Sequence, residues 1–263
     1  MKISVSSLLL IGVLIGVATP GARALSDNEA AGGRLVARRY ADAVVGVKAS
    51  LFMKFKIGLQ TTPQTERKID LSGTMIDASG TTVTALSVID PKAIFDAMRG
   101  QMNAGAEPVE LGQTEYRNIR FRLGDGTEIP ARIVWKDPQH DLVVLSPDGA
   151  AAKNHTFTFV ELSHATESAS LQGTYFALSR AGDEFQRVPL LRASTVEGII
   201  DRPRRLLLVN SVSYPDTLGC PVFDIEGRVL GICLRNVDKG TPKSTVVVPA
   251  SDLASIIAAA APE

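Results

Sequence analysis

The sequence predicts an all-β protein of antiparallel strands with a short C-terminal helix. Short apolar runs recur at regular spacing along the chain, and turns rich in Gly, Asn and Asp separate them. The composition is that of a globular protein, with 45% hydrophobic and 21% charged residues. A length of 263 residues is enough for one large β domain or two small ones.

The first 24 residues are set apart from the rest of the chain. Lys2 gives a positive start, Leu8–Ala18 is apolar, and Ala22–Ala24 fits a small-x-small cleavage site. The apolar stretch is well short of the roughly 20 residues that span a bilayer. We therefore predict a signal peptide over Met1–Ala24, a mature chain beginning at Leu25, and export to the periplasm or out of the cell with no remaining membrane span.

The first half of the mature chain is expected to form an N-terminal arm over residues 25–42 and a β-barrel over residues 43–150. Ser26–Ala41 is polar and rich in alanine, which favours a short helix or arm, and Pro91–Arg99 begins with the proline typical of a helix start. Lys54–Arg67 and Gly100–Leu111 are expected to be loops. The predicted strands are Ala43–Phe52, Asp70–Asp77, Thr81–Leu86, Tyr116–Leu123, Glu128–Trp135 and Asp141–Leu145.

The second half, residues 151–263, predicts another β-barrel followed by a helix. Asp148–Asn154 is small and polar and is the best candidate for a linker, and Ser251–Ala260 is predicted to be a helix capped by Ser251. The predicted strands are Phe157–Leu162, Thr174–Leu178, Arg187–Ile199, Arg205–Val209, Val222–Asp224, Val229–Leu234 and Thr245–Val248.

Charge and histidine content exclude several classes of function. Basic and acidic residues are equal, at 28 each, and no basic stripe indicates a nucleic-acid partner. The chain has no nucleotide-binding loop and no cluster of metal ligands, so no cofactor or metal is predicted. His140, His155 and His164 have no partner at metal-ligand spacing and are interpreted as surface residues.

Three segments, in this order, carry the functional signal. They are Ser72–Ile89 (SGTMIDASGTTVTALSVI), Asp125–Leu145 (DGTEIPARIVWKDPQHDLVVL) and Tyr214–Ile232 (YPDTLGCPVFDIEGRVLGI). Together they resemble the protease domain of trypsin-like serine proteases of the high-temperature-requirement (HtrA/Deg) type, whose third segment reads N-P-G-N-S-G-G-P-L-F-D-x-x-G-x-V-I-G-I. The resemblance covers roughly Ala43–Ala258 and does not include the peptide-binding PDZ domain of many members. It implies a trypsin-like pair of six-stranded antiparallel β-barrels.

The resemblance also implies where a catalytic triad would lie. The general base corresponds to Ser87, the orienting carboxylate to Asp141 and the nucleophile to Leu218, so only the carboxylate is kept. The chemistry needs a hydroxyl that attacks and an imidazole that takes its proton, and leucine has no nucleophilic atom. The oxyanion-loop positions are Asp216, Thr217 and Leu218, with aspartate where the family has a glycine that lets the backbone turn.

These departures predict an inactive protease homologue that binds a peptide or protein in the cleft between the barrels. Two alternatives remain open. One is an active endopeptidase with rearranged residues, for example with the Cys220 thiol as nucleophile, which would need a histidine nearby. The other is a structural subunit that packs against an active protease or against further copies of itself.

Cys220 and Cys233 permit one disulfide in an exported protein. If Glu226 and Gly227 form a two-residue turn, the residues of each facing pair sum to 453, so Cys220 lies opposite Cys233 in a non-hydrogen-bonded pair. We predict a possible disulfide at this pair, with two buried thiols as the alternative.

Overall fold

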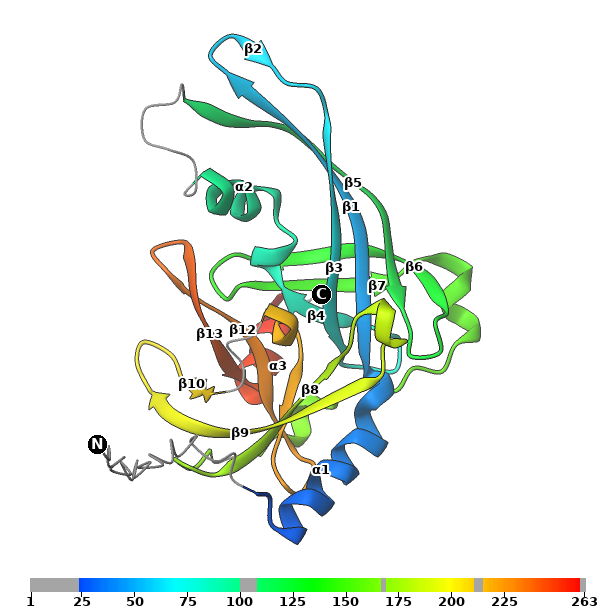
Figure 1. Cartoon of the computed structure of the whole chain (residues 1–263), viewed down its shortest axis with the longest axis vertical. Coiled ribbons are helices and arrows are strands. Elements are labelled where there is room, and N and C mark those ends of the chain that lie inside the picture. The colour runs from blue at the N-terminus through cyan, green and yellow to red at the C-terminus, as the bar shows by residue number, and fades with distance from the viewer. Residues whose placement is uncertain (1–23, 100–107, 167–168, 211–214, 261–263) are drawn as a thin grey trace, which may run out of the picture.

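Two antiparallel β-sheets form the body of the protein in a computed structural model (Figure 1). The structure describes residues 24–99, 108–166, 169–210 and 215–260. The predicted signal peptide, apart from Ala24, and the start of the predicted loop at 100–111 lie outside these residues. The double-barrel fold predicted from the resemblance is confirmed.

The first sheet is ordered β2-β1-β3-β4-β7-β6-β5, and β5 also pairs with β1, which closes six of its strands into a ring. Its apolar residues alternate along β1, where Val45, Val47 and Leu51 are buried, because successive side chains of a strand point to opposite faces. The strands are β1 (Val44–Ile57), β2 (Gln60–Thr61), β3 (Thr65–Met75), β4 (Thr82–Ala85), β5 (Val109–Arg122), β6 (Glu128–Asp137) and β7 (Leu142–Pro147).

The second sheet is a closed barrel ordered β10-β13-β12-β11-β8-β9. Its strands are β8 (Thr174–Arg180), β9 (Pro189–Ile200), β10 (Leu206–Val209), β11 (Pro221–Phe223), β12 (Val229–Asp238) and β13 (Thr241–Pro249). The predicted strand over Phe157–Leu162 is wrong. This stretch forms no strand and is tied to the first barrel by the Val160 N–H, which donates to the Met75 carbonyl at 2.9 Å.

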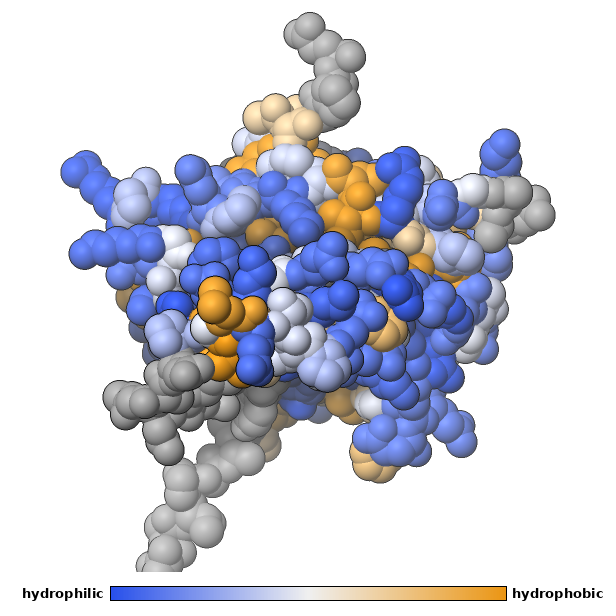
Figure 2. Space-filling view, turned by 90° about the horizontal axis from the view of Figure 1, so that it is seen from above, coloured by the Kyte–Doolittle hydropathy of each residue, from blue (hydrophilic) through white to orange (hydrophobic). Residues whose placement is uncertain are grey.

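An extended arm of β-structure replaces the loop predicted over Lys54–Arg67. β1 and β5 have 14 residues each, and they run beyond the barrel to the end of the molecule where β2 lies (Figure 1). Phe55 of β1 stacks on Phe95 of helix α2 (Pro91–Arg99) at 5.9 Å between ring centroids. Seen from above, the surface is largely hydrophilic, and its hydrophobic residues form separate patches (Figure 2).

Two further helices pack on the second barrel. Helix α1 (Asp27–Tyr40) starts with a capping box between Ser26 and Glu29, and it lies against β8 and β9. A Cβ at Gly32 would collide with the Ile225 carbonyl, so glycine permits this close approach. Helix α3 (Ala250–Ala260) follows β13 directly. No helix in the described ranges is long and apolar enough to cross a membrane.

A single cluster of buried apolar side chains joins the two barrels. It includes Val83 and Leu142 from the first barrel and Ile232 and Leu234 from the second. The buried guanidinium of Arg180 on β8 also bridges to the start of the first barrel, since it donates to the carbonyls of Ala41 and Val44 at 2.6 Å each. The predicted linker at 148–154 contains a 3-10 turn over Gly149–Asn154.

Candidate functional site

Ser87 and Asp141 lie together between the barrels, as the resemblance implies. Ser87 follows β4 in a 3-10 turn over Leu86–Val88, and Asp141 precedes β7, which pairs with β4. The Asp141 carboxylate accepts the Ser87 N–H at 2.6 Å, the Ser87 hydroxyl at 3.2 Å and the Arg235 N–H at 2.7 Å. Because Arg235 belongs to β12, the carboxylate links the two barrels.

Asp141 is 2% exposed and adopts a left-handed backbone with φ of 55°. Burial raises the pKa of its carboxyl, against the opposing effect of the donors from Arg235 and Ser87. Within this arrangement Ser87 offers a hydroxyl where catalysis needs a base, and a serine hydroxyl does not accept a proton near neutral pH. The pair links the two barrels, and it lacks the imidazole that takes the proton in a serine-protease triad.

We expect Asp141→Ala to lower the free energy of unfolding by about 2 kcal/mol or more, because two buried N–H groups lose their acceptor. Asp141→Asn is the matched control, since it keeps one acceptor and tolerates the left-handed backbone, and it should lose less. Because the pKa of the Asp141 carboxyl is higher in the folded than in the unfolded protein, folding favours its protonated form. The contribution of Asp141 to the free energy of unfolding therefore falls as the pH rises from the unfolded-state pKa to the folded-state pKa. Equal midpoints for both variants in urea unfolding would contradict this role.

Leu218 is a core residue. It is 2% exposed and belongs to the cluster that joins the barrels, together with Ala85, Leu142 and Cys220. The cluster thus includes residues close in sequence to Ser87 and Asp141 as well as Leu218, the position that the resemblance assigns to a nucleophile. Its side chain contributes packing there and has no atom that could react.

Of the three oxyanion-loop positions, Asp216 and Thr217 lie in a 3-10 turn over Pro215–Thr217, and Leu218 follows it. The Asp216 carboxylate makes two hydrogen bonds to the Arg192 guanidinium of β9, at 3.0 and 2.9 Å, and Thr217 is fully buried. Gly219 then turns the chain with φ of +81°. The loop is thus held by an ion pair that sequence reasoning missed, since 24 residues separate its partners.

In this structure both cysteines of the possible disulfide are free thiols and both are buried. Cys220 packs in the cluster that joins the barrels, whereas Cys233 packs in a separate cluster within the second barrel. The backbone next to the pair is irregular, since the Gly219 N–H donates to the Cys233 carbonyl at 2.8 Å and the Cys220 N–H donates to the Thr217 carbonyl at 3.0 Å. The Cys233 N–H donates to the Cys220 carbonyl at 2.9 Å, so the pair is also not the non-hydrogen-bonded one predicted.

We expect both cysteines to titrate as thiols in denaturant without reductant, and neither to react readily in the native protein. Burial raises the pKa of Cys220 to about 12 and raises that of Cys233 as well, and the thiolate is the reactive form. Ellman's reagent, with and without denaturant, measures both states. Finding no thiol in denaturant would show that the bridge forms after all.

The histidines have partners other than Cys220 and Asp141 within the part of the chain that the structure describes. His140 Nδ1 lies 2.5 Å from the Asp137 carboxylate, His164 pairs with Glu161 at 3.0 Å, and His155 stacks on Phe157. In the same described ranges, no three His, Cys, Asp or Glu side chains are placed to hold a metal ion.

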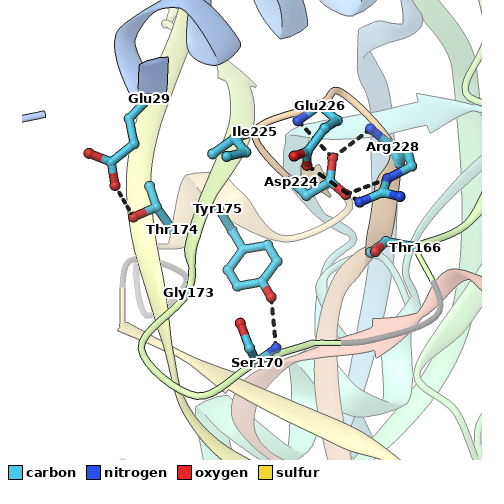
Figure 3. Close-up of a pocket in the computed structure, with 10 residues that line it drawn as sticks. All are labelled: Glu29, Thr166, Ser170, Gly173, Thr174, Tyr175, Asp224, Ile225, Glu226 and Arg228. Atoms are coloured by element: carbon cyan, nitrogen blue, oxygen red, sulfur yellow. Dashed lines mark hydrogen bonds and ion pairs between the residues drawn. The ribbon is translucent and has the colours of Figure 1, made fainter. Parts of the chain in front are cut away.

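Two cavities open on the second barrel. The first, of about 260 Å³, lies between helix α1 and the β11–β12 hairpin, and its polar side chains bond to one another (Figure 3). Tyr175 accepts the Ser170 N–H at 2.9 Å, and Asp224 accepts the Arg228 Nε–H at 2.7 Å. The second cavity, of about 320 Å³, lies at the end of the barrel near the start of β12.

A sequence profile for the trypsin-like peptidase domain matches residues 71–232, which is more than half of the chain. The chain belongs to this family. The matched span contains Ser87, Asp141 and Leu218. No curated protein sequence matches the chain.

Solved structures of the family share the fold. The MamO protease domain of Magnetospirillum magneticum, in its apo form, is 18% identical with a TM-score of 0.51 and covers 83% of this chain and 97% of its own. Deg5 is 19% identical with a TM-score of 0.56, over 88% of this chain and 94% of its own. AlgW, an HtrA-type protease with a serine-to-alanine substitution and a tripeptide, is 14% identical with a TM-score of 0.57, over 86% of this chain and 62% of its own.

Proposed function

We propose that this protein is a catalytically inactive member of the trypsin-like peptidase family, of the HtrA/Deg type, that acts after export by binding a peptide or protein. The main support for the proposal is which residues stand at the nucleophile and base positions, and how they pack. Leu218 is buried among apolar side chains, and Ser87 hydrogen-bonds to Asp141 where a base would stand. In well-studied serine proteases, loss of the nucleophile alone lowers kcat by a factor on the order of 10⁶.

The alternative with a cysteine nucleophile is less well supported. Cys220 is fully buried, its thiol lies 3.5 Å from the Asp216 carbonyl, and burial raises its pKa to about 12. A catalytic thiol needs the opposite, namely a lowered pKa, solvent access and a nearby base. The residues at the reacting positions therefore favour binding over hydrolysis.

We expect no casein hydrolysis above background between about pH 5 and about pH 9, and no labelling by a serine-reactive phosphonate. An active HtrA-type protease assayed in parallel is the positive control. Casein cleavage that Cys220→Ala abolishes would replace this proposal with a thiol protease. Cleavage that Cys220→Ala leaves intact would favour another rearranged set of residues. Co-purification with an active protease from the exported fraction would favour a structural subunit.

A further inference from the structure

We propose that the second cavity of the second barrel is a binding site for a small carboxylate with a short apolar side chain, either free or as the last residue of a peptide. The cavity has a volume of about 320 Å³, at the small end of the range for ligand sites. Its lining combines an apolar floor with a single cation at the rim.

The floor of this cavity is built from the barrel itself. Leu207 of β10 and Leu230 of β12 are 1% and 3% exposed, and Pro249 of β13 is also buried. Ala169 lines the cavity and packs against the same cluster as the two leucines. These short, well-packed side chains offer an apolar surface that can accept an aliphatic group of a few carbons.

The polar groups at the rim of the cavity can all donate hydrogen bonds. Arg205 directly precedes β10, and Ser163, Thr166 and Ser251 contribute hydroxyl groups to the same lining. None of the described lining residues is acidic. A guanidinium recognises a carboxylate through two parallel N–H···O bonds, and neighbouring hydroxyls can donate to the same oxygens.

Arg205 is one of several arginines with no side-chain partner among the described residues, and it is the one of them that lines this cavity. Among the described residues it forms no hydrogen bond, ion pair or ring contact, although it is only partly exposed. The first cavity provides the contrast, because Arg228 there is bound by Asp224 and Glu226. A half-buried cation without a counter-ion, placed above an apolar floor, is completed by an anionic ligand.

This cavity is separate from the site between the barrels. Leu230 lies five residues before Arg235 on β12, and the Arg235 N–H is the one bonded to Asp141. At about 3.4 Å per residue in an antiparallel strand, the two places are about 17 Å apart along β12. Binding here therefore does not depend on the catalytic positions, and the proposal stands whether or not the protein hydrolyses peptides.

Isothermal titration of the protein with N-acetyl-leucine tests the proposal, with N-acetyl-leucinamide as the neutral ligand of nearly the same shape. We expect saturable binding of the acid and at least about tenfold weaker binding of the amide, because the amide cannot pair with a guanidinium. Arg205→Gln should weaken binding of the acid by at least about tenfold. Arg34→Gln, which replaces an exposed arginine on α1, is the matched control and should leave it unchanged.

A tripeptide ending in leucine distinguishes the two sources of the ligand. Tighter binding of the tripeptide acid than of N-acetyl-leucine would assign the site to peptide ends, and equal binding would assign it to free acids. Ala169→Leu, which adds volume to the lining, should weaken both without altering the melting temperature by much. Absence of saturable binding to wild-type protein, or equal affinity of acid and amide, would overturn the proposal, as would binding insensitive to Arg205→Gln.

Discussion

Replacing Gly219 with alanine should destabilise the protein by about 3 kcal/mol or more, the largest single-residue effect that we expect outside the buried leucines. Gly219 adopts φ of +81°, and a left-handed backbone alone costs a residue with a Cβ about 1 kcal/mol. The new Cβ would also collide with the Ser72 carbonyl and the Thr84 hydroxyl. These two groups bond to each other at 2.7 Å, so the collision disrupts a buried hydrogen bond as well.

Gly219 is sensitive because both barrels hold it. Its carbonyl accepts the Thr74 hydroxyl of the first barrel at 2.7 Å, and its N–H donates to Cys233 of the second at 2.8 Å. The residue therefore cannot move to relieve the collision without breaking contacts on one side. Backbone collisions of this kind are not removed by a rotamer change, unlike collisions with a long side chain.

Gly126→Ala is the matched control for this prediction. Gly126 has φ of +87°, and nothing lies within 4 Å of the position that a Cβ would take. It should therefore show the cost of the backbone conformation alone, about 1 kcal/mol. Urea unfolding of both variants measures the difference. Similar losses in the two variants would mean that the loop at Gly219 adapts, and that the junction of the barrels is looser than its hydrogen bonds indicate.

Most of the fold could be predicted from the sequence because the patterns that specify it are local. Alternating apolar residues and turn residues set most strands correctly, and the resemblance that the three motifs carry implied that Ser87 and Asp141 lie together. The stretch at 157–162 misled because its apolar residues are buried without joining a ladder. Burial alone does not distinguish a strand from a buried connecting segment.

In the hairpin after Leu218, a turn that is one residue longer than predicted is offset by a bulge in the strand. The predicted register is correct at Val222, which faces Gly231. The turn is longer than predicted, since the Asp224 N–H donates to the Arg228 carbonyl around a three-residue loop. A bulge between Val222 and Phe223 takes up the extra residue. The longer turn and the bulge thus offset each other, and the predicted facing pairs are correct from Val222 outward.

The partners of the charged side chains could not be predicted because they lie far away in the sequence. Arg180 binds carbonyls 136 and 139 residues away in sequence, and Arg192 of β9 binds Asp216 in the turn before β11. Such contacts depend on how whole strands are placed, and a single sequence carries no local pattern for them. The same holds for Arg205, whose lack of a partner among the described residues is visible only when its neighbours in space are known.

The last prediction concerns the reacting groups. Leu218→Ser combined with Ser87→His would restore the order of nucleophile, base and carboxylate against Asp141. We nevertheless expect no measurable hydrolysis, because Leu218 is 2% exposed and a serine there would lie within the buried apolar cluster that joins the barrels. The variant should also lose about 2–4 kcal/mol of stability, since a buried leucine is removed and a hydroxyl is left in an apolar site.

Leu218→Ala is the matched control, because it creates a similar cavity without a hydroxyl and should account for most of the loss in stability. Adding Asp216→Gly to the double variant frees the loop from Arg192 and restores the glycine that an oxyanion loop favours. We expect weak labelling by a serine-reactive phosphonate to appear first in this triple variant, if the protein still folds at low temperature. Strong labelling of the double variant would show that position 218 reaches solvent readily. The cleft would then be an intact active site that lacks only the serine at position 218 and the histidine at position 87. Burial of Leu218 would not explain the absence of hydrolysis.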